Sequence, residues 1–183
     1  MINRLIALFL FLAVSPLLLV IAVLIYLEDG FPILFEQKRV GKNCAFFMII
    51  KFRTMKIATP NVATHLLENP DQYILKIGKF LRKYSLDEVP NLLNIINGDM
   101  VFVGPRPALY NQNDLMDLRI LEGIDSLTPG ITGWAQINGR DEISIERKVR
   151  LEKEYLERKS FWFDTLILLK TFVSLLGSKG VAH

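Results

Sequence analysis

The chain has 183 residues, the length of one domain or of one domain with an anchor. Hydrophobic residues make up 51% of it and charged residues 22%, which excludes an intrinsically disordered protein. A net charge of +3 is too small to indicate nucleic-acid binding, so we expect no nucleic-acid partner. One cysteine and two histidines exclude an internal disulfide and the usual zinc centres, so any metal should be a hard cation bound by oxygen.

The first element in chain order is an apolar segment, because residues 5–27 contain no charged side chain. A helix of that length reaches roughly 35 Å and can cross a hydrocarbon core of ~30 Å. A cleaved signal peptide fits poorly, since its apolar region would be only about 7–15 residues long and would end at small residues. We therefore interpret residues 1–28 as a membrane anchor and residues 29–183 as a separate domain.

Ser15 and Pro16 lie at the midpoint of this segment. Proline removes a backbone hydrogen bond and breaks or kinks a helix, and the Ser15 hydroxyl is a candidate donor to the carbonyl left free. Two topologies are therefore open. The segment is either a kinked helix that crosses the bilayer or a re-entrant hairpin with halves of ~16 Å that returns to the same side. The charges of Arg4, Glu28 and Asp29 do not decide between them.

The segments that follow predict a small sheet and several helices. Residues 33–41 and 45–52 are apolar runs around a turn and predict a β-hairpin. Asn69 and Pro70 predict a helix start. A second helix is expected to end at Asn97-Gly98, and it is capped either by the Ser85–Glu88 capping box or by Asp87, which would put Pro90 inside the first turn. Residues 104–107 must form an irregular turn because they contain two prolines.

Two helices are predicted near the end of the chain, over residues 144–159 and 161–176. The second is strongly apolar but carries Asp164 and Lys170, so we expect it to lie in the membrane interface or against the anchor. The fold class is therefore predicted as mainly α with a small β-hairpin (α+β), with amphipathic interfacial helices beside the N-terminal segment.

Asp87 and Glu88 are adjacent carboxylates at a predicted helix start. The simplest interpretation is structural, since acidic residues cap helices and complement the helix dipole. Adjacent carboxylates also suit phosphoryl transfer, in which one binds Mg²⁺ while the other attacks phosphorus. A helix N-terminus is a natural place for phosphate, so both interpretations fit this position.

Phosphoryl transfer also needs cations that bind phosphate oxygens. The candidates are Lys51, Arg53, Arg82, Arg106 and Arg140. Each of them alone is more often a solvated surface charge. Arg106 is the exception, because a proline on either side fixes its backbone for no evident packing reason.

Together these motifs form an ordered set that resembles a known family. They are Ser15-Pro16, Lys51-Phe52-Arg53-Thr54-Met55, Ser85-Leu86-Asp87-Glu88-Val89-Pro90, Asn97-Gly98-Asp99-Met100, Val103-Gly104-Pro105-Arg106-Pro107, Pro129-Gly130-Ile131-Thr132-Gly133 and Asn138-Gly139-Arg140. Each motif is weak, but their order from about residue 3 to about residue 175 resembles the bacterial sugar transferases, the monotopic polyprenyl-phosphate phosphoglycosyl transferases. The chain looks like the minimal catalytic form of that family.

The resemblance implies a reaction and a site. A sugar-1-phosphate would pass from a UDP-sugar to undecaprenyl phosphate, releasing UMP and leaving a polyprenyl diphosphate sugar, as the first membrane step of surface-glycan synthesis. Asp87 would be the nucleophile that forms a phosphosugar intermediate, Glu88 would bind Mg²⁺ with Asp87 beside it, and Arg106 would contact phosphate. The sugar is not indicated, and whether the chain forms a homo-oligomer is left open.

The resemblance also implies a location. Family members break the N-terminal helix at the serine-proline pair and enter only one leaflet, which favours the re-entrant topology for Ser15-Pro16. The catalytic domain would then face the cytoplasm at the bacterial inner membrane. Members often have aspartate where this chain has Ala7, which puts any polar contact of that residue in doubt, and Glu152 stands where aspartate is usual.

Two other classes of function remain to be separated. A membrane-anchored interaction module, with Asp87 and Glu88 as a mere cap, would show no nucleotide-sugar turnover and no Mg²⁺ dependence. An ordinary glycosyltransferase would release a nucleoside diphosphate instead of a monophosphate.

Overall fold

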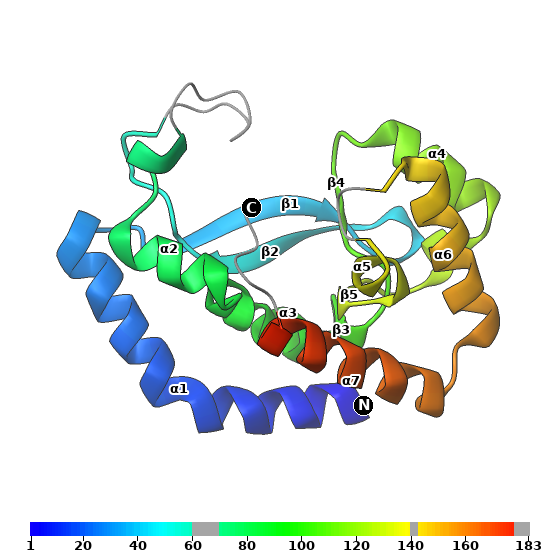
Figure 1. The fold of residues 1–183 in the computed structure, drawn as a ribbon, viewed down its shortest axis with the longest axis horizontal. Coiled ribbons are helices and arrows are strands. Elements are labelled where there is room, and N and C mark those ends of the chain that lie inside the picture. Colours follow the sequence, from blue (N-terminus) through cyan, green and yellow to red (C-terminus); the bar gives the residue numbers. More distant parts are fainter. Residues whose placement is uncertain (60–69, 140–142, 178–183) are drawn as a thin grey trace.

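The computed structural model describes residues 1–59, 70–139 and 143–177. The described chain is mainly helical with two small sheets (Figure 1). Its elements are α1 (Ile2–Asp29), β1 (Leu34–Val40), η1 (Lys42–Cys44), β2 (Phe46–Phe52), η3 (Pro70–Gln72), α2 (Lys76–Lys83), η4 (Leu86–Asn91), α3 (Leu92–Asn97), β3 (Val101–Val103), β4 (Ala108–Leu109), α4 (Asn113–Leu121), η5 (Ile124–Ser126), β5 (Gly130–Thr132), α5 (Trp134–Ile137), α6 (Ile145–Arg158) and α7 (Phe161–Gly177).

The predicted hairpin is confirmed. β1 and β2 pair in antiparallel fashion from Leu34 opposite Phe52 to Val40 opposite Phe46. The short strand β4 adds to the other edge of β1, and β3 pairs with β5 in parallel to form a second sheet. These additions were not predicted, because strands of two or three residues carry too little alternation to be recognised.

α1 is continuous through Pro16, so the structure has a bend where the sequence predicted a break (Figure 1). Ser15 Oγ donates to the carbonyl of Leu12 at 2.8 Å. That carbonyl lies four residues before Pro16. A residue with an N–H at position 16 would donate a hydrogen bond to it, but proline cannot. The Ser15 hydroxyl supplies the donor instead, so its predicted role is confirmed. Within the described residues, α1 alone is long and apolar enough to span a bilayer.

One face of α1 packs on the rest of the molecule over both of its halves. Ala7, in the first half, is fully buried in a core cluster with Leu92 and Ile95. Ile21 and Ile25, in the second half, belong to another cluster with Leu75 and Leu81. The other face is strongly exposed at Ile2, Leu5, Phe9, Leu12, Leu19 and Leu27.

The segment that carries the two carboxylates differs from the prediction. Ser85 adopts a left-handed conformation with φ 53°, and its side chain makes no capping bond, so the predicted capping box is wrong. An N-cap residue needs extended backbone, which this conformation excludes. Asp87 and Glu88 instead lie in the first turn of η4, and α3 begins only after Pro90. The predicted stop is confirmed, since Gly98 ends α3 with φ 95°.

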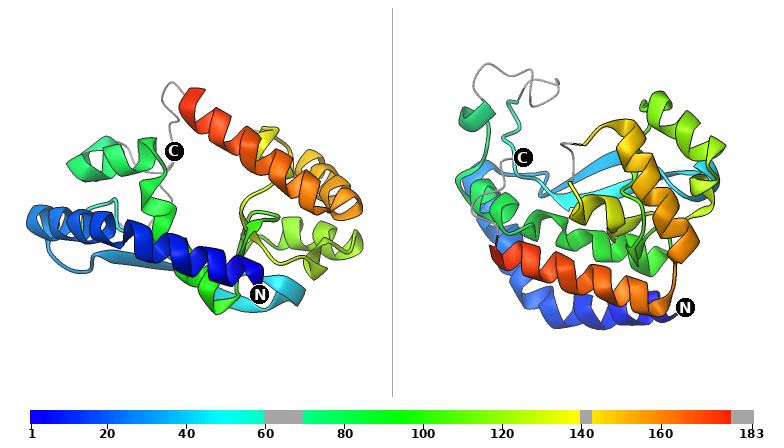
Figure 2. Two further views of the ribbon diagram at one scale, coloured as in Figure 1. Left: turned by 90° about the horizontal axis from the view of Figure 1, so that it is seen from below. Right: turned by 45° about the vertical axis from the view of Figure 1, so that its right-hand side comes forward.

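The two C-terminal helices form as predicted, and Ser144 caps α6. α7 packs mainly on α5, β3 and β5 instead of α1. Seen from below, α1 and α7 are both visible on the same side of the molecule, and they do not lie against each other (Figure 2). α7 exposes large apolar side chains at Phe161, Trp162, Leu169, Phe172 and Val173. Exposed apolar surface of this extent indicates a membrane or partner surface.

Candidate active site

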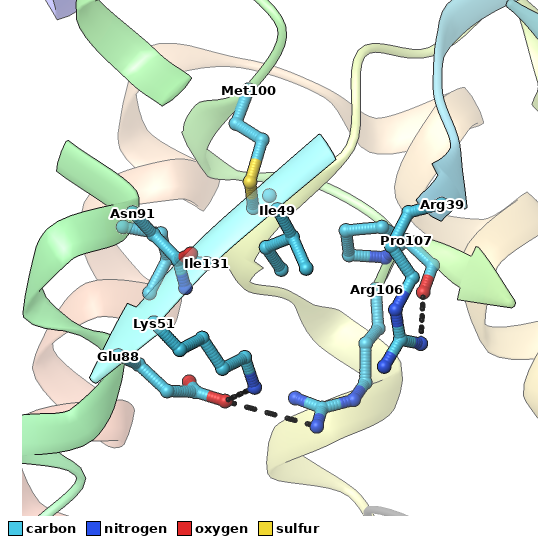
Figure 3. A pocket seen from close by; sticks show the side chains of 10 residues that line it. Arg39, Ile49, Lys51, Glu88, Asn91, Met100, Arg106, Pro107 and Ile131 are labelled. Atoms are coloured by element: carbon cyan, nitrogen blue, oxygen red, sulfur yellow. Dashed lines mark hydrogen bonds and ion pairs between the residues drawn. The ribbon is translucent and has the colours of Figure 1, made fainter. Parts of the chain in front are cut away.

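Strand β2, helix η4 and the turn after β3 bring three charged side chains together (Figure 3). Lys51 Nζ lies 2.6 Å from Glu88 Oε1, and Arg106 Nη2 lies 3.8 Å from the same oxygen. The three side chains are 16%, 23% and 36% exposed for Lys51, Glu88 and Arg106, so they are shielded but open to a ligand. They line a narrow cavity together with Arg39, Ile49, Asn91, Met100, Pro107, Gly130 and Ile131.

Asp87 precedes Glu88 in η4 and is half-buried. The pKa of its carboxyl is raised to about 6, first by burial and then by the negative charge of Glu88. The positive charges of Lys51 and Arg82 partly oppose this rise. A carboxyl with this pKa is still mostly ionised at pH 7, and it is more basic than an ordinary aspartate. Perturbation of this kind is typical of groups that take part in catalysis.

Arg82 reaches the same region from α2. Its Nε donates to Thr54 Oγ1 at 2.9 Å, and the backbone of Thr54 accepts from Leu75 N at 3.0 Å. Burial lowers the pKa of Arg82, and the charge of Asp87 counteracts that effect. Arg82 therefore provides positive charge beside Asp87 from a fixed position.

The oxygen atoms at this site suit a hard divalent cation. Asp87 and Glu88 supply carboxylates, and Asn91 supplies an amide oxygen one helical turn beyond Glu88. Asn91 is 2% exposed, lines the cavity, and has a buried Oδ1 without a hydrogen-bond partner among the described residues. Mg²⁺ is usually bound by one or two carboxylates, water and substrate phosphates, so these donor types suit Mg²⁺, although no three acidic, histidine or cysteine side chains gather into a metal site among the described residues.

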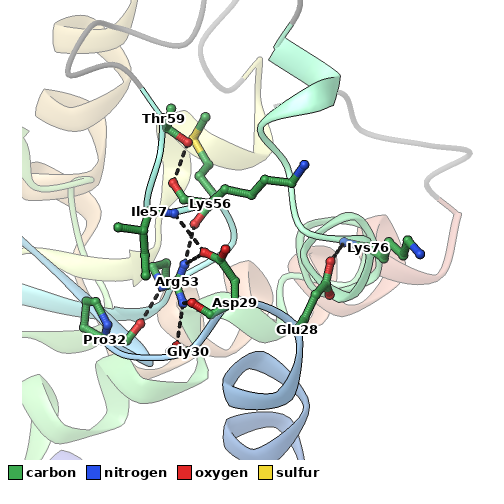
Figure 4. Close-up of polar contacts among 10 residues, drawn as sticks. Glu28, Asp29, Gly30, Pro32, Arg53, Lys56, Ile57, Thr59 and Lys76 are labelled. Carbon is green, nitrogen blue, oxygen red and sulfur yellow. Dashed lines mark hydrogen bonds and ion pairs between the residues drawn. The ribbon is translucent and has the colours of Figure 1, made fainter.

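Arg53 does not belong to this group of residues. Its side chain lies beside Asp29, Gly30 and Pro32 and is 7% exposed (Figure 4). Its guanidinium pairs with Asp29 and donates to the carbonyls of Asp29, Gly30, Pro32 and Met55 at the end of α1. These contacts give Arg53 a structural role instead of the predicted phosphate contact. Arg140 lies outside the described residues.

The end of α1 also caps α2. Leu75 is the N-cap residue of α2, and its side chain has no hydrogen-bond acceptor. The Glu28 carboxylate takes over the capping role (Figure 4). Glu28 Oε1 accepts from Lys76 N at 2.6 Å, and Oε2 accepts from Ile77 N at 3.1 Å. The anchor is therefore tied by a carboxylate to the helix that carries Arg82.

Sequence reasoning missed Asn91 and Arg39 at the cavity. Asn91 is an ordinary residue in an apolar helix, and only its position after Asp87 and Glu88 could have drawn attention to it. Arg39 lies in a charged stretch of β1, and its contact with the carbonyl of Pro107 at 3.1 Å depends on the fold. No sequence signal links residues that far apart.

Comparison with known proteins agrees with the motif order. The model of the family described as "Bacterial sugar transferase" matches residues 1–178. The chain belongs to the bacterial sugar transferase family. It is therefore an enzyme of the type that its named relatives represent.

Three of the relatives illustrate the similarity. The sugar transferase EpsL of Bacillus subtilis is 39% identical over 96% of this chain and 85% of its own length. The UDP-glucose:undecaprenyl-phosphate glucose-1-phosphate transferase of Escherichia coli is 38% identical over 87% of this chain and 36% of its own length. An N-acetylgalactosaminephosphotransferase of Aeromonas hydrophila, which by name uses UDP-N-acetylgalactosamine and undecaprenyl phosphate, is 36% identical over 91% of this chain and 40% of its own length.

Proposed function

We propose that the protein transfers a sugar-1-phosphate from a UDP-sugar to undecaprenyl phosphate, releasing UMP, in the first membrane step of surface-glycan synthesis. The relatives named for this reaction support the substrates. The observation that carries the proposal is the ion pair of Lys51 with Glu88, because it places a cation and a carboxylate at the cavity, and Glu88 is the chain neighbour of the more basic carboxylate of Asp87.

Asp87 is the nucleophile in this proposal. One carboxylate oxygen attacks the β-phosphorus of the UDP-sugar, the bond from phosphorus to the UMP oxygen breaks, and UMP leaves. The Asp87 carboxylate then carries the sugar phosphate as an acyl phosphate. A pKa of about 6 keeps this carboxylate ionised near neutral pH and makes it a better nucleophile than an ordinary aspartate.

Three cations and Glu88 support this step. Lys51 and Arg106, now held by Glu88, are placed to bind phosphate oxygens of the donor, and Arg82 balances charge beside Asp87. Glu88, with Asp87 and the unpaired oxygen of Asn91, would hold Mg²⁺. When bound, Mg²⁺ would offset the repulsion between the Asp87 carboxylate and the diphosphate.

The second step regenerates Asp87. A phosphate oxygen of undecaprenyl phosphate attacks the same phosphorus, and the bond from phosphorus to Asp87 breaks. The lipid product carries a diphosphate and the sugar. Two successive displacements at one site suit a soluble donor and a large membrane-bound acceptor, because the two need not be bound together.

We propose further that α1 enters the membrane and returns to the same side. Both halves of α1 pack on one folded body, Ala7 against α3 and Ile25 against the cluster with Leu81. A straight crossing would carry this body, with charged side chains such as Lys79 and Arg82, into the hydrocarbon, where charge is costly. The exposed apolar side chains of α1 and α7 provide the contact with lipid, and both helices lie on the side of the molecule that is seen from below (Figure 2).

This topology places the active domain on one surface of the membrane. We assign that surface to the cytoplasmic face of the bacterial inner membrane, because nucleotide sugars are made in the cytoplasm. Product analysis tests the reaction. Purified protein supplied with a UDP-sugar and undecaprenyl phosphate should release UMP, and an enzyme that releases UDP instead would be a glycosyltransferase of another class.

A further inference from the structure

The turn that carries Arg106 is held by hydrogen bonds to the carbonyl groups of four residues, 103, 105, 106 and 107. Tyr155 Oη donates to the carbonyl of Val103 at 3.1 Å, and Gly130 N donates to that of Pro105 at 2.9 Å. The carbonyls of Arg106 and Pro107 accept from Arg119 Nη2 at 3.0 Å and from Arg39 Nη1 at 3.1 Å. Prolines at 105 and 107 have no N–H to form such bonds, so the carbonyl bonds fix this turn.

Arg119 is itself fixed in a buried pair. Its Nε and Nη2 donate to the two carboxylate oxygens of Glu152 at 2.8 and 2.5 Å. Arg119 is 5% exposed and Glu152 is 2% exposed. A bidentate pair of this kind sets the plane and direction of the guanidinium, and a buried pair of charges is costly enough to suggest a role other than stability alone.

We infer that Arg119 is a positioning residue for Arg106, and that Glu152 holds Arg119 in place. Nη2 of Arg119 bonds both Glu152 and the carbonyl of Arg106, so α4 and α6 determine where the Arg106 backbone lies. The Arg106 guanidinium then points at Glu88 instead of at solvent (Figure 3). This inference rests on the proposed phosphate contact of Arg106.

A lysine at position 119 separates this role from charge. Arg119→Lys keeps a cation for Glu152 but loses the planar two-nitrogen grip on Glu152 that holds Nη2 against the carbonyl of Arg106. We expect turnover to fall about tenfold, the range in which loss of one charge-assisted hydrogen bond lies. Arg150→Lys on the exposed side of α6 is the matched control and should leave turnover unchanged.

A double-mutant cycle tests whether the effect passes through Arg106. In an Arg106→Ala background, Arg119→Lys should change turnover less than twofold, because the side chain that it positions is gone. An equal loss in both backgrounds would overturn the inference. If Arg106→Ala alone leaves turnover unchanged, the proposed phosphate contact fails instead, so the two failures are distinguishable.

A double variant in which both members of the buried ion pair become apolar separates loss of function from loss of folding. Replacing a buried ion pair by apolar residues of similar size is often neutral or stabilising, so Arg119→Met with Glu152→Met should keep or raise the melting temperature. The same double variant should still lose about tenfold in turnover, as expected for the missing hydrogen bond. A variant of unchanged stability and unchanged turnover would also overturn the inference.

Discussion

Lys51 Nζ contacts Glu88 Oε1 at 2.6 Å, so the lysine of the cavity is held by the carboxylate that is not proposed to attack. Asp87 is left in a half-buried position with a pKa of about 6. The division of roles between two adjacent carboxylates therefore follows from their surroundings. One is neutralised by an ion pair, and the other is made basic by burial.

The raised pKa of Asp87 predicts a pH dependence of turnover. Attack needs the ionised carboxylate, and ionisation is lost as the pH falls through about 6. We expect kcat/KM to be near its plateau at neutral pH and to fall about tenfold per pH unit well below the pKa. A pH–rate profile of the purified protein checks this. An acid limb near pH 4 would mean that burial does not control this carboxyl.

Removing the lysine should move that profile. The charge of Lys51 lowers the pKa of Asp87, so Lys51→Met should shift the acid limb to higher pH. It should also lower turnover at pH 7, since a phosphate contact is lost. Lys42→Met, at an exposed lysine in the hairpin turn, is the control. A lower plateau with an unmoved acid limb would contradict the electrostatic role of Lys51.

Much of this arrangement was predictable from the sequence, and some was not. Local patterns identified the hairpin, α6, α7 and the carboxylates, because each depends on neighbours in the chain. The capping role of Ser85 was predicted wrongly, because its left-handed backbone depends on how α2 meets η4. Arg53 was grouped with the phosphate ligands because its motif gives no sign of Asp29 or Gly30 as partners.

The anchor should be accessible at both ends from one side. With exposed Cys44 changed to serine, single cysteines can be placed at Asn3 in the first turn of α1 and at Phe31 just after its end, and each can be labelled in oriented membrane vesicles. An impermeant maleimide should modify both from the same side. Labelling from opposite sides would show that α1 crosses the bilayer. Pro16→Ala restores the missing hydrogen-bond donor, so it should straighten α1 and shift the labelling toward opposite sides.

The link between α1 and α2 predicts a stability effect. Glu28 accepts two backbone N–H groups at the start of α2, and loss of a capping acceptor costs about 1 kcal/mol. Glu28→Leu should lower the free energy of unfolding in detergent by about that amount. Glu36→Leu, an exposed glutamate in β1, is the matched control. Equal stability of the two variants would mean that the cap contributes nothing.

The most direct test of the account is to trap the covalent intermediate. Wild-type protein incubated with a UDP-sugar labelled in its sugar, without lipid acceptor, should release one UMP per active site and retain the label on Asp87, as read by peptide mass spectrometry. Asp87→Asn should retain no label and show no turnover, because an amide cannot act as this nucleophile. If UMP is released only when undecaprenyl phosphate is also present, and no label is found on residue 87, covalent catalysis by Asp87 is contradicted.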